Sequence, residues 1–165
     1  MIQKGLFLFP QSAQYTTGHI LTMERKYRYF RTRFGDFGKM PFLEVRLRNG
    51  ENYIDVDCLV DSGAVDSMFH TDFADELGID LHGREQRDYC AVDGNVMRGW
   101  VVPLQLEING IAHPVHIEVA FVEENEIPLL GQTGFFDSFE VRFRGFHGLF
   151  EIIPVLDPGT DKYLM

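Results

Sequence analysis

The chain is predicted to be a single-domain, all-β protein with one or two short helices, closed into a barrel or a sandwich. Three observations predict this fold class. The 165 residues suit one domain. Short apolar or alternating segments recur at the spacing of hairpins. Asn-Gly and Asp-Gly pairs, which are strong turn signals, separate several of them. A hydrophobic content of 45%, including 15 Phe, can fill one core.

The elements follow one another as strand, turn and strand from about residue 40 onward. The expected strands are residues 42–47, 53–60, 68–70, 89–92, 96–102, 104–108, 114–122, 139–143 and 148–153, and residues 127–131 form a buried apolar run that ends in a glycine. Turns at Asn49-Gly50 and Asn109-Gly110 close two of the hairpins. A helix is expected over residues 71–77, where Thr71 can serve as the cap, and a second short helix over residues 133–139.

Charge divides the chain unevenly. Residues 1–48 hold 9 Lys/Arg and 3 Asp/Glu, a net charge of +6, whereas residues 49–165 hold 6 and 22, a net charge of −16. We therefore predict an N-terminal, partly basic leader or arm over residues 1–39, a folded domain over residues 40–153 and a loose tail over residues 154–165. Met23 is an alternative start of the protein, and the arm could be a regulatory segment that the protein itself removes.

The same distribution limits the partners. The basic and aromatic residues 25–33 could contact nucleic acid or an anionic lipid surface, but we favour a solvated strand face or an arm docked on the acidic body. The acidic remainder would repel nucleic acid, so no nucleic-acid partner is expected. No run approaches the ~20 apolar residues of a membrane span. Two cysteines make no disulfide framework, and Cys58 reads as a buried thiol; we expect a reducing, cytoplasmic location.

The most informative motif is Asp61-Ser62-Gly63, which follows the apolar strand that ends at Val60. A charge removed from water costs several kcal/mol unless it is paired or neutralised. An aspartate in this position suits a carboxylate that shares a proton with another carboxylate. On this tripeptide alone, the competing interpretation is a structural carboxylate that caps a turn.

Four ordered pieces of the chain together resemble the retropepsin-like aspartic proteases over roughly residues 40–153. They are Asp61-Ser62-Gly63-Ala64 with Ser67; the helix end Leu77-Gly78-Ile79; the hairpin tip Asp93-Gly94-Asn95; and the run 127–131, which contains Leu130 and Gly131 and is followed by residues 135–141. The resemblance implies a closed barrel whose flap is the hairpin around residues 88–101. It also implies an aspartic endopeptidase that needs no metal and no cofactor.

The resemblance assigns roles to these residues. Two carboxylates about 3 Å apart share one proton, so the ionised one acts as general base on a water and the protonated one polarises the scissile carbonyl. Asp61 would be the catalytic carboxylate, and Ser62, Gly63, Ala64 and Ser67 would support it. The flap residues that would cover an extended peptide are Val92, Asp93, Gly94, Asn95 and Trp100. Trp100 could equally be a packing residue of the hairpin.

Only half of the required carboxylate pair is visible in the sequence. The nearest candidate for a second motif, Asp157-Pro158-Gly159, follows no suitable apolar strand, and its proline offers no hydroxyl. We therefore expect a two-fold homodimer, in which Asp61 of each subunit meets at the axis. Viral members of the family place an Asp and an Arg, which form an ion pair, where this chain has Val65 and Gln132; dimer affinity is therefore open. Asp66 either partly replaces that pair or faces the substrate backbone.

The expected function is hydrolysis of a peptide or protein substrate whose sequence preference the chain does not reveal. The alternative is a catalytically silent dimer of the same fold that binds a peptide or a protein partner. His113 and His116 are the weak signal for a metal, but positions three apart on a strand point to opposite faces, so no metal site is expected.

Overall fold

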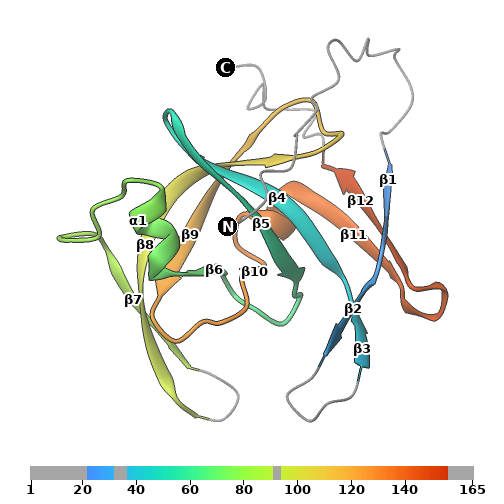
Figure 1. Cartoon of the computed structure of the whole chain (residues 1–165), viewed down its shortest axis with the longest axis horizontal. Helices are drawn as coiled ribbons and strands as arrows, with labels where there is room; N and C mark the ends of the chain where they lie inside the picture. Colours follow the sequence, from blue (N-terminus) through green and yellow to red (C-terminus); the bar gives the residue numbers. More distant parts are fainter. Residues whose placement is uncertain (1–21, 32–36, 91–93, 156–165) are drawn as a thin grey trace.

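The computed structural model describes residues 22–31, 37–90 and 94–155. Strands dominate these residues and both α-helices are short, which confirms the predicted all-β fold (Figure 1). The strands are β1 (Met23–Lys26), β2 (Arg28–Arg31), β3 (Phe37–Met40), β4 (Phe42–Asn49), β5 (Asn52–Val60), β6 (Ser67–His70), β7 (Gln86–Cys90), β8 (Val96–Ile108), β9 (Val115–Val122), β10 (Leu129–Leu130), β11 (Phe139–Arg144) and β12 (Leu149–Pro154). The helices are α1 (Thr71–Glu76), α2 (Phe135–Ser138) and the 3-10 turn Gly145–His147.

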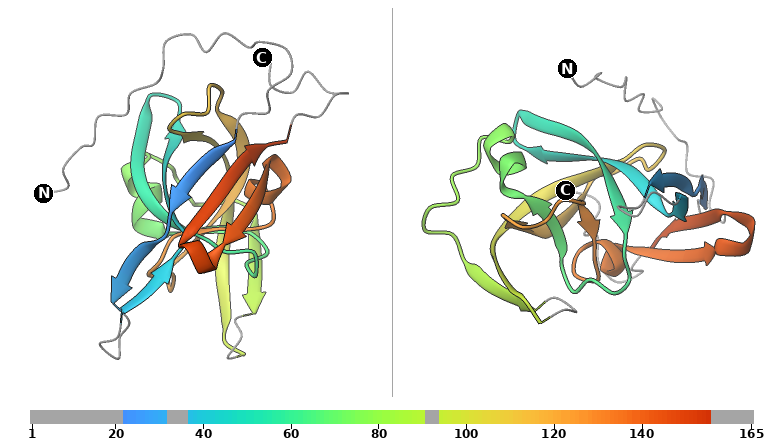
Figure 2. Two further views of the ribbon diagram at one scale, coloured as in Figure 1. Left: turned by 90° about the vertical axis from the view of Figure 1, so that its right-hand side faces the viewer. Right: turned by 60° about the horizontal axis from the view of Figure 1, so that its bottom comes forward.

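A closed barrel forms the body of the molecule. The strand order is β4-β5-β10-β6-β9-β8-β7, and β4 also pairs with β8, so the sheet closes on itself and β7 extends beyond the closure. The β7–β8 hairpin therefore projects from the barrel, and the β2–β3 hairpin projects from the same end (Figures 1 and 2). The chain segment between β5 and β6, which carries Asp61, lies at this end as well.

The barrel interior is filled by aliphatic and phenylalanine side chains. Five phenylalanines are almost completely buried: Phe69, Phe121, Phe135, Phe139 and Phe150. A second, smaller apolar cluster of Met68, Tyr89, Ala120 and Val122 lies where β7 meets β6 and β9. Cys58 is fully buried, as predicted, and this burial raises the pKa of its thiol well above the ordinary value.

Two local predictions were wrong in detail. The segments 96–102 and 104–108 form one strand, β8, that continues through Pro103. Along one edge β8 pairs with β7 up to Trp100 and with β4 from Gln105, and a residue without an N–H is tolerated where that edge changes partner. The cap of α1 is His70 rather than Thr71, because the His70 Nδ1 atom accepts a hydrogen bond of 3.2 Å from the Asp72 N–H.

The described part of the predicted arm contacts the domain. β1 pairs with β12, which also pairs with β11, so the three strands form a separate antiparallel sheet. Arg28 of the β2–β3 hairpin makes an ion pair of 2.7 Å with Asp57 of β5. Removal of residues 1–39 as a leader stays a prediction. Within the described ranges, no helix is long and apolar enough to cross a bilayer.

Candidate active site

Asp61 stands at the start of a tight turn directly after β5. The Ala64 N–H donates to the Asp61 carbonyl over 3.2 Å and so closes the turn. The Gly63 N–H donates to Asp61 Oδ1 over 2.9 Å, which orients the half-buried carboxylate. Among the described residues, no donor reaches the second oxygen, Oδ2. The turn therefore holds a carboxylate in a fixed direction and leaves one of its oxygens available.

A second segment, distant in sequence, is bonded to this turn. The Asp61 N–H donates to the Leu130 carbonyl over 3.0 Å. In the other direction, the Gln132 and Thr133 N–H groups donate to the carbonyls of Ala64 and Val65 over 2.9 and 2.8 Å. The structure thus brings the predicted Leu130–Gly131 element against the Asp61 turn by backbone bonds that rigidify both segments.

Gly131 and Ser67 form a further contact between the two segments. The Gly131 N–H donates to the hydroxyl of Ser67, which is fully buried, over 3.1 Å. A Cβ atom on Gly131 would lie 2.4 Å from the carbonyl oxygen of Asp66, so only glycine permits this approach. Both residues were expected to be site residues from the sequence, and the structure bonds them to each other at this junction.

Val65 and Gln132 stand at the two positions where viral retropepsin-like proteases carry an ion pair. The Val65 side chain is 67% exposed. Gln132 Nε2 donates over 2.7 Å to the Ser62 carbonyl, so this side chain supports its own turn.

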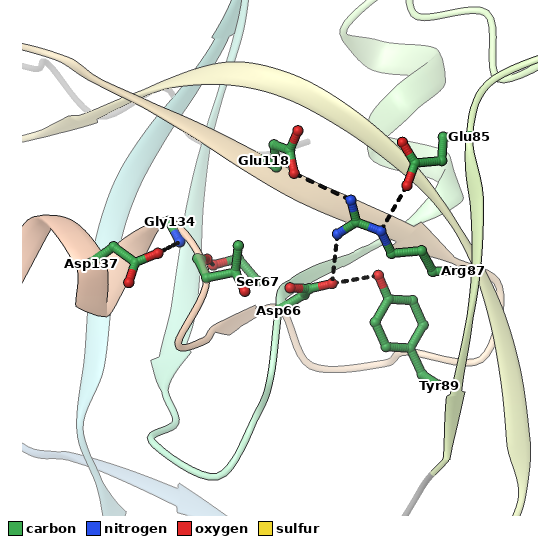
Figure 3. Close-up of polar contacts among 9 residues, drawn as sticks. Asp66, Ser67, Glu85, Arg87, Tyr89, Glu118, Gly134 and Asp137 are labelled. Carbon is green, nitrogen blue, oxygen red and sulfur yellow. Dashed lines mark hydrogen bonds and ion pairs between the residues drawn. The ribbon is translucent and has the colours of Figure 1, made fainter.

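Asp66 is engaged inside its own chain. It is only 5% exposed. Its Oδ2 atom accepts a hydrogen bond of 2.7 Å from the Tyr89 hydroxyl and a longer one, 3.5 Å, from Arg87 Nη1 (Figure 3). Arg87 also pairs with Glu85 over 2.9 Å and with Glu118 over 3.4 Å. The ion pair of Asp66 is thus made with Arg87 of its own chain, and a role for Asp66 in a dimer or toward substrate stays a prediction.

Sequence reasoning missed Arg87 and Tyr89. They are two apart in β7, so both side chains project from one face, but the expected strand began only at residue 89 and left Arg87 out. That spacing identifies the face but not Asp66 as the partner, because Asp66 lies 23 residues from Tyr89 in the sequence.

The predicted flap is the β7–β8 hairpin. Val92 and Asp93 lie outside the described residues. Gly94 has a φ of 85°, and Asn95 is exposed beside it. Gly99 lies against Tyr89 and Val122, so the next residue, half-buried Trp100, projects from the opposite face of β8. Contact of these residues with a peptide stays a prediction.

The described ranges contain no group of three or more His, Cys, Asp or Glu side chains arranged to hold a metal ion.

The Tyr89 hydroxyl should make the free energy of unfolding depend on pH in the alkaline range. Burial, followed by the hydrogen bond to Asp66, raises the pKa of Tyr89 above its ordinary value of 10.0. Above about pH 10 the unfolded chain has lost this proton and the native chain still holds it, so stability falls as pH rises. We expect Tyr89→Phe to lose less free energy of unfolding than wild type between about pH 9 and pH 11, by up to ~1.4 kcal/mol per pH unit above pH 10. Urea titrations at each pH measure this difference, and parallel slopes would contradict it.

Comparisons with known proteins bear on the fold. No family model matches the chain, and no curated protein matches it. A solved structure does: the crystal structure of a retropepsin-like aspartic protease from Rickettsia conorii, with 20% sequence identity and a TM-score of 0.55. The match covers 82% of this chain and 99% of that one. The chain therefore has a retropepsin-like fold.

Proposed function

We propose that the chain is an aspartic endopeptidase, which hydrolyses peptide bonds with a water activated between Asp61 of one subunit and Asp61 of a second. The geometry of the Asp61 turn carries the proposal. Gly63 orients one carboxylate oxygen, and no described donor occupies the other. That oxygen is free to share a proton with a second carboxylate, as general acid–base hydrolysis by an aspartate pair requires.

The second carboxylate is best supplied by another copy of the chain. Two other carboxylates of this region are engaged: Asp66 accepts bonds from Tyr89 and Arg87, and Asp137 accepts a bond of 3.1 Å from the Gly134 N–H (Figure 3). A two-fold axis beside the turn would bring two Asp61 side chains together. Within the described residues β1 and β11 each pair only with β12, so both edges of this three-stranded sheet can accept a further strand.

The projecting β7–β8 hairpin is a reason to propose a peptide as the substrate. An extended peptide can bind beside such a hairpin through backbone hydrogen bonds, as an added strand. The solved structure with a similar fold is that of a retropepsin-like aspartic protease, which favours the same class of reaction. The role of Asp61 in this chain rests on the turn geometry.

The test combines cleavage with assembly. Wild-type protein is incubated with a mixed peptide library from about pH 4 to about pH 7, where one shared proton can be retained by a carboxylate pair. Sedimentation at the same concentrations measures the dimer. We expect cleavage that a transition-state mimic of the pepstatin type inhibits, and activity that follows the dimer fraction. No cleavage by a protein shown to be dimeric would contradict the proposal.

One observation favours a second candidate, a catalytically silent dimer that binds peptide. Val65 and Gln132 can form no charged link, so a dimer of this chain would lack the ion pair that residues at these positions form in viral retropepsin-like proteases. Peptide binding without cleavage in the same assay would identify this alternative.

A further inference from the structure

The contact between Asp66 and the β7 strand joins the floor of the site to its projecting hairpin. Asp66 lies five residues after Asp61, and a backbone bridge to Thr133 fixes its main chain. Its main chain therefore belongs to the same bonded junction as the Asp61 turn. Its side chain leaves that junction and reaches Tyr89 and Arg87 on β7 (Figure 3).

This carboxylate is too buried to be an incidental surface charge. A carboxylate that is 5% exposed is costly to retain unless its charge is paired and hydrogen-bonded. The bond of 2.7 Å from the Tyr89 hydroxyl is short, as expected for a charged acceptor. Tyr89 is also buried against Met68, Ala120 and Val122. This packing fixes the ring and therefore the position of its hydroxyl.

The β7 strand is joined to the barrel by one strand pairing, by the packing of Tyr89 and by polar contacts of its side chains. Within the described residues it pairs with β8 along one edge, and no strand pairs with its other edge. Arg87 adds a contact of 3.4 Å to Glu118 on β9. The Asp66 contact is thus the polar link that runs directly from the Asp61 side of the barrel to this strand.

We propose that Asp66 is a positioning residue, which acts through Tyr89 and Arg87 to hold the β7–β8 hairpin in a fixed place relative to the Asp61 turn. The proposal rests on the function proposed above, because a bound peptide would lie between that hairpin and the turn. A hairpin held in place binds peptide without first having to be ordered. Loss of the link therefore weakens peptide binding more than it slows the chemical step.

Two substitutions remove the link in different ways. Tyr89→Phe deletes only the hydroxyl and keeps the packed ring. Asp66→Asn keeps an acceptor for the hydroxyl but removes the charge that Arg87 faces. We expect each to raise KM by about tenfold, the equivalent of one lost hydrogen bond to a charged group, with a smaller change in kcat. Because both act on one contact, the double variant should exceed the more severe single variant only slightly.

Asp57→Asn is the matched control. Asp57 lies on β5 and pairs over 2.7 Å with Arg28, both side chains are exposed, and neither residue belongs to the β7–β8 hairpin. This variant should keep the wild-type KM. A variant that only lowers the folded fraction would reduce apparent kcat and leave KM unchanged, so a raised KM separates positioning from general destabilisation.

Hydrogen exchange supplies a readout that needs no activity. Peptides that cover β7 should exchange faster in Tyr89→Phe and Asp66→Asn than in wild type, whereas those from β4 and β5 should not change. This pattern, with Asp57→Asn like wild type, supports the inference. Unchanged β7 exchange, or a KM no higher than that of the control, would overturn it. A wild type that cleaves no peptide would contradict the proposed function instead, and exchange would still decide whether Asp66 holds β7.

Discussion

Asp61→Asn is expected to lower the rate of peptide cleavage by about 10³-fold or more, because an amide can neither take nor give the proton that the reaction needs. In a homodimer the substitution removes both members of the carboxylate pair at once. The fold should persist, since the side-chain oxygen of Asn can still accept the bond that Gly63 now donates over 2.9 Å to Asp61 Oδ1. The measurement is kcat/KM on a peptide that the wild type cleaves, beside a urea titration of both proteins.

Asp57→Asn is the control for this substitution. Asp57 lies on β5, four residues before Asp61, is exposed, and pairs with Arg28. The control should keep wild-type cleavage within a few fold, as expected for an exposed ion pair of small energetic value. If Asp61→Asn protein, free of contaminating protease, cleaved as fast as this control, Asp61 would not be the catalytic carboxylate.

Mixing the variants tests whether two subunits share the site. Excess Asp61→Asn protein added to wild type should lower cleavage if subunits exchange, because a mixed dimer retains only one carboxylate. Excess Asp57→Asn protein should not. Equal behaviour of the two mixtures under conditions where exchange is demonstrated would favour a site complete within one chain.

The sequence predicted those features that neighbouring residues determine. The Asn49-Gly50 turn and the alternation around it define the β4–β5 hairpin locally, and the structure has it. The Asp61 turn is likewise local, since its bonds join residues two and three apart. Such features need only the preferences of turn residues and the period of a strand.

Other features depend on contacts that no local pattern encodes. The Tyr89 bond to Asp66 joins two segments whose proximity is set by the order of β6, β9, β8 and β7 in the barrel. The pairing of β1 with β12 joins the two ends of the described chain. Each of these two contacts depends on the register of the whole sheet. Hydrophobic alternation specifies only which face of a strand is buried.

Gly131→Ala is expected to destabilise the protein by about 3 kcal/mol, at the upper end of the usual cost of overpacking. The added Cβ would lie 2.4 Å from the Asp66 carbonyl oxygen, 2.5 Å from its carbonyl carbon and 2.9 Å from the Ala64 carbonyl oxygen. All three are backbone atoms, so no side-chain rotation can relieve the contact. The two bonded segments must separate instead, which moves the Asp61 turn.

Gly145→Ala is the matched control for that substitution. A Cβ at Gly145 meets only the Tyr27 hydroxyl, at an ordinary 3.8 Å, and Gly145 is not among the glycines with positive φ. The control should stay within about 0.5 kcal/mol of wild type in urea titrations, as is usual for surface substitutions. Equal stability of the two variants would show that the junction can open without loss. A large loss in Gly131→Ala alone, with cleavage reduced beyond its unfolded fraction, would show that the approach of the two segments both holds the barrel together and places Asp61.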